Sequence, residues 1–286
     1  MRRDNQARTM KGHKPTHNEQ PPPKNKMKNP LDFVTPTEMV TLPSGGRYPV
    51  DHPLHGVDTL EIKFMTAKHE DILASRSLLK SGMAIERLID SLIIDERVRG
   101  RDLMSGDRSS ILIHARASAY GRDYKTTITC PQCGNQQKMK FDLGEYDIYG
   151  GDEFNESEVT VTDRGTYEVK LPFTDIVAEI RPLYGADEQN IIKKTSKKSK
   201  KNSEEPETLV TDQMKAFVVA FNGYSERNIV EQVVDNLSMS DARYLRIIHG
   251  KISPTIEIKQ DFQCNNCDHE QEVDVPFGTD FFWPDR

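Results

Sequence analysis

The chain has 286 residues, which is enough for one large domain or two small ones. Hydrophobic residues make up 35% and charged residues 29%, so part of the chain is expected to lie outside any packed core. The formal net charge is −6, and no apolar run approaches the ~20 residues that cross a bilayer, which predicts a soluble protein. The N-terminus does not resemble a secretory signal, so we expect the reducing environment of a cytosol.

The first 35 residues predict a disordered, basic tail. They contain Pro21-Pro22-Pro23, several lysines and arginines, and few large apolar residues. A basic arm can bind nucleic acid. We favour a solvated tail, because no aromatic residue is interleaved with the basic ones to stack on a base.

Order is expected from about residue 38, with two strands before the first helix. Residues 40–48 predict a strand that ends in a Gly-Gly turn, and residues 60–64 alternate apolar and polar side chains as a half-buried strand does. Thr66 can then cap a helix that carries Glu70 and Asp71 in its first turn, near the positive end of the helix.

Two further helices are predicted in the first half of the chain. One has an apolar face with helical spacing, formed by Ile85, Leu88, Ile89 and Leu92. The next is expected to begin at Ser105 or Asp107 and to end at Gly121. Apolar stripes of this kind usually form core, so they predict no function.

All cysteines of the chain lie in two Cys-x-x-Cys motifs: Cys130, Cys133, Cys264 and Cys267. Alternating residues at 124–128 and 139–143 predict strands before and after the first motif, which is half of a zinc ribbon. Two such motifs provide four thiolates, the ligand set of a closed tetrahedral zinc site. We expect zinc to be structural here, because four thiolates leave no coordination position for a catalytic water.

Other interpretations of the cysteines are less favoured. A thioredoxin-like redox pair would open a helix in a βαβ unit, which neither motif does. A disulfide framework is typical of secreted proteins. His269, two residues after Cys267, is a substitute ligand that four thiolates make unnecessary. Whether the two motifs meet within one chain or between two subunits stays open.

The sequence also predicts an internal repeat of low identity. The matched positions are Val40, Leu42 and Pro43 with Val169, Leu171 and Pro172; Glu61, Ile62 and Glu70 with Glu179, Ile180 and Glu188; and Leu103 and Asp107 with Leu237 and Asp241. Residues 124–143 align with 258–277 without a gap. We favour a duplicated α+β fold over chance similarity, with each half supplying half of the zinc site about a pseudo-two-fold axis.

These patterns divide the chain into four segments. They are a basic tail at 1–35, a first α+β repeat at 36–148, a linker and hairpin at 149–165, and a second α+β repeat at 166–286. The hairpin is expected to turn at Asp163-Arg164-Gly165. Within the second repeat, the lysine-rich stretch 193–210 is expected to be a flexible insertion, and its adjoining acids weaken any contact with nucleic acid.

The remaining motifs indicate no catalytic site. His69, His114 and His249 have no nucleophile nearby in sequence, and no catalytic signature is present, which predicts that the protein is not an enzyme. The terminal run Phe281-Phe282-Trp283-Pro284 is expected to pack on the protein's own core, with docking into a partner as the alternative.

Several short motifs carry a family resemblance by their order along the chain. They are Leu60-Glu61-Ile62, the run 65–73, Leu79-Lys80-Ser81-Gly82, Gly106-Asp107-Arg108 with Ile111-Leu112, Ala119-Tyr120-Gly121, and Cys130-Pro131-Gln132-Cys133-Gly134. In these the chain resembles the baseplate hub subunit family of T4-type contractile-tailed bacteriophages. The resemblance covers residues 38–143 well and the second half more weakly.

The resemblance implies a structural or assembly protein of the phage baseplate hub. Its partners would be other baseplate or tail proteins, with no small-molecule substrate, and its location would be the virion tail baseplate and, during assembly, the host cytoplasm. The residues themselves leave another function open, a zinc-ribbon nucleic-acid-binding protein that grips phosphates through its basic tail and lysine run. A redox or hydrolytic enzyme would need a low-pKa thiol or an open metal position.

Overall fold

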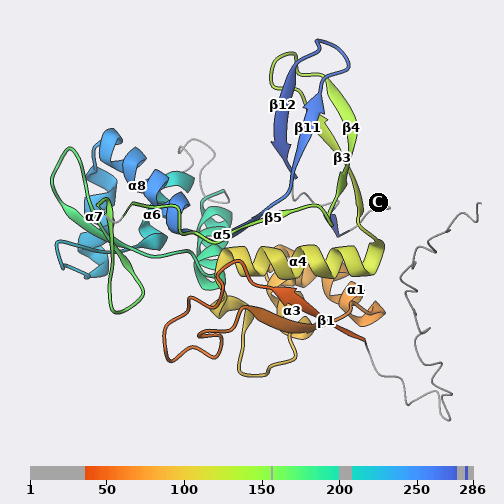
Figure 1. The fold of residues 1–286 in the computed structure, drawn as a ribbon, viewed down its shortest axis with the longest axis horizontal. Helices are drawn as coiled ribbons and strands as arrows, with labels where there is room; N and C mark the ends of the chain where they lie inside the picture. Colours follow the sequence, from red (N-terminus) through yellow and green to blue (C-terminus); the bar gives the residue numbers. More distant parts are fainter. Residues whose placement is uncertain (1–35, 156, 200–207, 276–280, 283–286) are drawn as a thin grey trace, which may run out of the picture. The chain divides into compact units, whose positions relative to one another are not determined.

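The computed structural model describes residues 36–155, 157–199, 208–275 and 281–282 (Figure 1). These residues form helices together with short antiparallel sheets, so the α+β prediction is confirmed. The predicted basic tail lies outside the described residues, as does Trp283. None of the described helices is both long enough and apolar enough to cross a membrane.

The first half begins with a two-stranded antiparallel sheet and continues into helices. Its elements are β1 (Thr37–Thr41), β2 (Thr59–Lys63), α1 (Ala67–Ala74), α2 (Arg76–Ser81), α3 (Ala84–Leu92), a 3₁₀ turn (Gly100–Asp102) and α4 (Ser105–Tyr120). The helix α3 buries Leu88, Ile89 and Leu92 of its predicted apolar face. The helix α4 begins at Ser105 and stops before Gly121, as predicted.

The second half contains a four-stranded antiparallel sheet with helices packed on it. Its elements are β6 (Val159–Val161), β7 (Tyr167–Lys170), β8 (Val177–Ile180), α5 (Gly185–Ser199), α6 (Leu209–Phe217), β9 (Val218–Phe221), α7 (Arg227–Asn236) and α8 (Met239–Ile252). The sheet order is β6-β7-β8-β9, and β6 and β7 form the predicted hairpin around residues 163–165. There are two hydrophobic cores: one around Leu88, which also takes in residues 256, 258, 275, 281 and 282 of the second half, and one around Leu245.

Two hairpins and a small sheet bring parts of the two halves together. The hairpins are β3 (Asp123–Thr129) with β4 (Gln136–Asp142), and β11 (Lys259–Gln263) with β12 (Glu270–Asp274). The small sheet pairs β5 (Asp147–Tyr149) with β10 (Thr255–Glu257). Each hairpin carries one Cys-x-x-Cys motif in its turn, and Figure 1 shows the two hairpins side by side.

The aromatic residues near the C-terminus pack on the first core. Phe281 and Phe282 are 2% and 5% exposed, and the ring of Phe281 stands edge-on to Tyr124 at 5.2 Å between centroids. The Arg116 Nε atom donates a hydrogen bond to the Phe281 carbonyl at 2.6 Å. Packing on the protein's own core, the favoured interpretation, is therefore confirmed for these two residues.

The stretch predicted to be a flexible insertion is helical at both ends. The helix α5 continues through Ser199 and α6 begins at Leu209, so both ends of the stretch 193–210 belong to helices. Lysine has a good helix propensity, which explains how the amphipathic start of α5 propagates into the lysine run. Residues 200–207 lie outside the described residues.

The matched positions of the two halves have equivalent hydrogen bonds. Asp107 of α4 accepts from the Ser44 N–H at 2.9 Å, and Asp241 of α8 accepts from the Phe173 N–H at 2.9 Å. Ser44 and Phe173 are the residues that follow the two matched prolines. The strand registers agree as well, because Glu61 lies opposite Met39 in β1–β2, and its match lies opposite Glu168 in β7–β8.

The start of α4 lies directly against the second half. A Cβ atom on Gly106 would overlap the carbonyl of Pro254, which immediately precedes β10. One turn of α4 therefore depends on the absence of a side chain at this position. By contrast, Gly250 of α8 has open space where a Cβ would lie.

These two helical glycines give a matched pair of variants. We expect Gly106→Ala to lower the free energy of unfolding by about 1–3 kcal/mol, because overpacking forces the backbone of residues 253–255 away. Gly250→Ala should raise it by roughly 0.5–1 kcal/mol through helix propensity. Urea denaturation of both variants measures the difference, and equal stability of the two would contradict this packing.

Candidate metal centre

The first Cys motif forms a tight turn between β3 and β4. The Cys130 N–H donates to the Asn135 carbonyl at 2.8 Å, and the Gly134 N–H donates back to the Cys130 carbonyl at 2.9 Å. Gly134 has a φ of 72°, a conformation that glycine adopts without steric cost. The turn thereby places the two sulfurs of the motif on the same side of the hairpin.

The second motif repeats this turn between β11 and β12. The Cys264 N–H donates to the His269 carbonyl at 2.9 Å, and the Asp268 N–H donates to the Cys264 carbonyl at 3.1 Å. Asp268 stands where the first turn has Gly134, and its φ is 53°. Aspartate tolerates this region better than most residues, so the second turn keeps its shape without glycine.

The structure brings all four cysteine sulfurs together within one chain. They lie within 4.8 Å of one another, with 3.7 Å between the Sγ atoms of Cys130 and Cys267 and 3.6 Å between those of Cys133 and Cys264. A zinc ion with bonds of ~2.3 Å to sulfur separates tetrahedral ligands by about 3.8 Å. The spacing of the sulfurs therefore suits a four-thiolate metal site.

Apolar packing and hydrogen bonds between the two hairpins hold the cysteine cluster in place. Cys130 and Cys264 are buried against the Phe262 ring, with Ile128, Met139 and Val273 around them. Gln137 of β4 connects the two hairpins, since its Nε2 donates to the Gln263 carbonyl at 2.8 Å and its Oε1 accepts from the Asn265 N–H at 2.9 Å. Cys133 is exposed, so the cluster lies close to the surface.

The four thiols cannot all ionise readily by themselves. A hydrogen bond from the Asn135 backbone lowers the pKa of Cys133 to about 6. The pKa of Cys267 rises to about 12, because the lowering effect of a hydrogen bond from the His269 backbone is outweighed by desolvation and by the other three sulfurs. Since like charges at this separation repel one another, a bound cation is what would allow four thiolates at neutral pH.

The histidines do not join this cluster within the part of the chain that the structure describes. His269 Nε2 lies 3.2 Å from Gln271 Oε1, so the structure does not use it as a substitute ligand. His249 is stacked on an aromatic ring, and burial lowers its pKa to about 4. His69 and His114 have hydrogen-bond partners in the first half.

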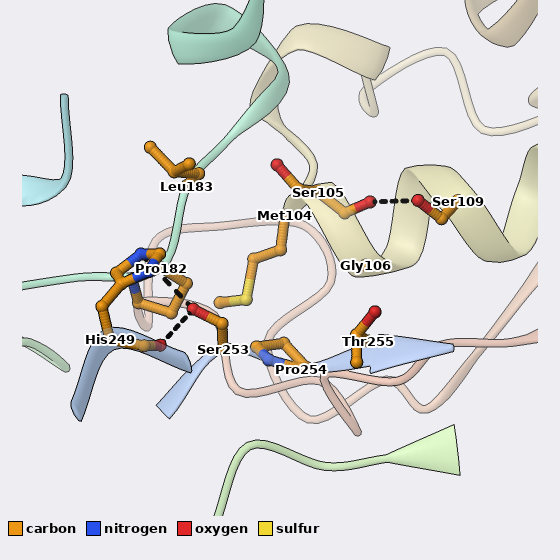
Figure 2. Close-up of a pocket in the computed structure, with 10 residues that line it drawn as sticks. All are labelled: Met104, Ser105, Gly106, Ser109, Pro182, Leu183, His249, Ser253, Pro254 and Thr255. Carbon is orange, nitrogen blue, oxygen red and sulfur yellow. Dashed lines mark hydrogen bonds between the residues drawn. The ribbon is translucent and has the colours of Figure 1, made fainter. Parts of the chain in front are cut away.

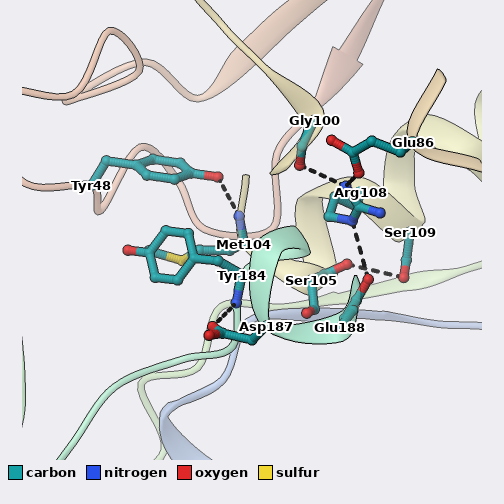
Figure 3. Close-up of polar contacts among 10 residues, drawn as sticks. All are labelled: Tyr48, Glu86, Gly100, Met104, Ser105, Arg108, Ser109, Tyr184, Asp187 and Glu188. Carbon is teal, nitrogen blue, oxygen red and sulfur yellow. Dashed lines mark hydrogen bonds and ion pairs between the residues drawn. The ribbon is translucent and has the colours of Figure 1, made fainter. Parts of the chain in front are cut away.

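A buried ion network joins α4 to α3 and α5 (Figure 3). Arg108 Nη1 lies 2.8 Å from Glu86 Oε2 and donates to the Gly100 carbonyl at 2.6 Å, while Arg108 Nε lies 3.2 Å from Glu188 Oε2. The side chains of Arg108 and Glu86 are each 6% exposed. Because Glu188 belongs to the second half, this network fixes one half against the other.

The sequence prediction missed this network, because it treated Gly106-Asp107-Arg108 only as a helix start. A signal was present in the spacing. Arg108 lies three residues before Ile111 and four before Leu112, on the apolar side of the helix. An arginine in that position must be buried with a partner, although spacing does not tell which carboxylates provide it.

A cavity of about 180 Å³ lies where the start of α4 meets the second half (Figure 2). Its lining residues are Met104, Ser105, Gly106, Ser109, Pro182, Leu183, His249, Ser253, Pro254 and Thr255. These side chains are small hydroxyls and apolar groups with one half-buried histidine, and the Ser253 hydroxyl already donates to the His249 carbonyl at 2.6 Å. The lining offers no carboxylate, lysine or arginine to recognise a charged ligand.

The fold and the cysteine cluster define an α+β protein with a candidate structural metal centre. The family model of the T4 bacteriophage base plate protein matches residues 35–283, so the chain belongs to this family. The match includes the second half, for which the sequence resemblance was weaker. No curated protein and no solved structure matches the chain.

The cysteine cluster makes a direct prediction about thiol chemistry. In protein isolated without chelator, we expect about one zinc per chain and slow alkylation of all four cysteines, because metal-bound thiolates are protected. After chelation, the exposed Cys133 should react quickly. Elemental analysis and mass spectrometry of alkylated peptides measure both. Metal-free protein with four equally reactive thiols would contradict the assignment.

Proposed function

We propose that this baseplate protein is a structural or assembly component of the baseplate hub, and that zinc holds its two halves in a fixed orientation. Membership of the baseplate family supports the structural role and the location in the virion tail. The convergence of four sulfurs from two distant hairpins is the observation that carries the zinc proposal. The partners would be other baseplate or tail proteins, met first in the host cytoplasm during assembly.

We further propose that the two halves arose by duplication. The equivalent aspartate hydrogen bonds, the equal strand registers and the equal turn geometry of the two Cys motifs support this. The sulfur distances are also nearly symmetric. Exchanging the two halves converts the pair Cys130–Cys267 into the pair Cys264–Cys133, and the two distances are 3.7 and 3.6 Å. Each half would then supply one half-site, with a local two-fold axis through the metal.

Bound zinc would fix the orientation of the two hairpins more than it would stabilise the two hydrophobic cores. The hairpins pack in the core around Leu88 through Tyr124, Phe141 and Val273, whereas near the cysteines they meet only across a small apolar cluster around Phe262. Cys130 and Cys267 are 137 residues apart, so a metal that joins them also restricts the unfolded chain strongly. The paired hairpins would thus present one rigid surface to neighbouring proteins in the baseplate.

The proposed function is tested with a ligand-deficient variant and a ligand-retaining control. The double substitution Cys130→Ser and Cys264→Ser removes one sulfur from each half-site, and we expect at least a tenfold loss of incorporation into baseplates. Cys267→His keeps four zinc ligands and should retain most of the metal and most of the incorporation. Complementation of a phage that lacks the protein measures both, with zinc content determined in parallel.

Normal incorporation of the metal-free double variant would refute the zinc staple while leaving the family assignment intact. The nucleic-acid alternative is separable as well, because phosphate contacts give binding that falls steeply with salt. Retardation of DNA or RNA at low salt by the purified protein would favour that alternative over protein–protein recognition.

A further inference from the structure

The start of α4 is covered by an extended segment of the second half. The Ser105 N–H donates to the Leu183 carbonyl at 2.9 Å, and the Gly185 N–H donates to the Leu103 carbonyl at 2.9 Å. Met104 and Tyr184, both labelled in Figure 3, lie between these bonds as an isolated antiparallel bridge. The backbone of residues 103–105 is thus hydrogen-bonded to the backbone of residues 183–185 as in a short pair of antiparallel strands.

Among the described residues, no segment covers the equivalent start of α8 in this way. Met239 stands where α4 has Ser105, and its side chain is 82% exposed. Beside it, Phe173 is 72% exposed, although its counterpart Ser44 is buried at 1%. Phe173 is tied to this end of α8 by its hydrogen bond to Asp241. Within the described part of the chain, two large apolar side chains are therefore exposed at the position that is covered in the first half.

The chain carries a second copy of the segment that provides the cover. By the alignment that matches Glu61 with Glu179 and Glu70 with Glu188, residues 183–185 correspond to residues 65–67. The helices confirm the register, because α1 begins at Ala67 and α5 begins at Gly185. Ala67 is exposed and Met65 is half-buried, so segment 65–67 lies at the surface.

The backbone groups of the two surfaces are complementary. Ala67 and Met239 are each the first residue of a helix, so neither N–H has an acceptor within its own helix. If the hydrogen bonds seen at α4 are repeated at α8, the Met239 N–H donates to the carbonyl of Met65, and the Ala67 N–H donates to the carbonyl of Leu237. Each surface thus offers one donor and one acceptor to the other.

Side-chain sizes at this contact fit as well. At the start of α4, Gly185 has no room for a Cβ, because both the Arg108 guanidinium and the Gly100 carbonyl lie against it. The α8 residue that corresponds to Arg108 is Ala242, so the guanidinium that excludes a Cβ at Gly185 has no counterpart against Ala67. The other part of the covered face is not reproduced, because Ser240 has a side chain where Gly106 has none. The contact is therefore confined to segment 65–67.

We propose that segment 65–67 of a second copy of this chain docks on the exposed start of α8, beside Phe173 and Met239. The contact is heterologous, since it joins two different surfaces, and it leaves one free surface of each kind on the pair. Repetition would build a ring or an open chain of copies. The proposal rests on the equivalence of the two halves proposed above, and it does not depend on zinc.

Proline substitutions at the two helix starts test the proposal. Proline is well tolerated at the first position of a helix and removes its N–H, and both preceding residues, Thr66 and Ser238, have the extended backbone that proline requires. We expect Ala67→Pro and Met239→Pro each to weaken self-association of the full chain by about tenfold or more. Arg76→Pro, at the start of α2 after an extended Ser75, is the matched control and should associate like the wild type.

Mixing the two variants gives the sharper result. Ala67→Pro retains an intact α8 surface and Met239→Pro retains an intact segment 65–67, so a one-to-one mixture should form dimers and nothing larger. Sedimentation velocity over a range of concentrations measures the species, with circular dichroism and zinc content as checks of folding. A wild type that stays monomeric, a mixture that stays monomeric, or variants that associate like the control would each overturn the proposal. Loss of zinc from the wild type would instead contradict the metal centre.

Discussion

The convergence of four sulfurs from two distant hairpins is the constraint on which the rest of this structure depends. Sulfurs that lie within 4.8 Å of one another cannot all be thiolates without a cation, and the two pairs cannot be separated without moving one hairpin relative to the other. The β3–β4 hairpin is followed along the chain by β5, and the β11–β12 hairpin is preceded by β10. The strands β5 and β10 pair with each other. The position of the cluster is therefore transmitted directly to the segments that connect the two halves.

Two of the contacts between the halves differ in character. At the cysteines, the contact is symmetric, because each Cys motif has the same turn and the two short sulfur distances exchange when the halves are exchanged. At the start of α4 the contact is one-sided, because Gly106 and Arg108 pack on the second half while the corresponding Ser240 and Ala242 do not reproduce these contacts. A symmetric contact uses the equivalent surfaces of both halves, whereas a one-sided contact leaves the equivalent surface of the other half, here the start of α8, available for binding.

Three consecutive residues at the start of α4 have three different structural roles. Gly106 permits the approach of the chain at Pro254, Asp107 accepts hydrogen bonds from the Ser44 N–H and the Tyr48 hydroxyl, and Arg108 joins Glu86 to Glu188. Only the aspartate is retained in the second half, at Asp241. This fits the difference in context, because the aspartate orders the loop of its own half, whereas the glycine and the arginine face the other half.

The sequence by itself determined much of the local structure. The apolar face of α3, the limits of α4, the 159–171 hairpin and the pairing of the cysteines into two turns follow from periodicity, glycine and cysteine spacing, which act over a few residues. Only the tertiary structure decided that the two Cys motifs meet within one chain, and that Arg108 is paired with carboxylates from both halves. These depend on how two cores orient across more than a hundred residues of chain. The composition of the lysine run predicted a flexible insertion, whereas the helix α5 extends through this run as far as Ser199, because a helix that has begun adds residues at little cost.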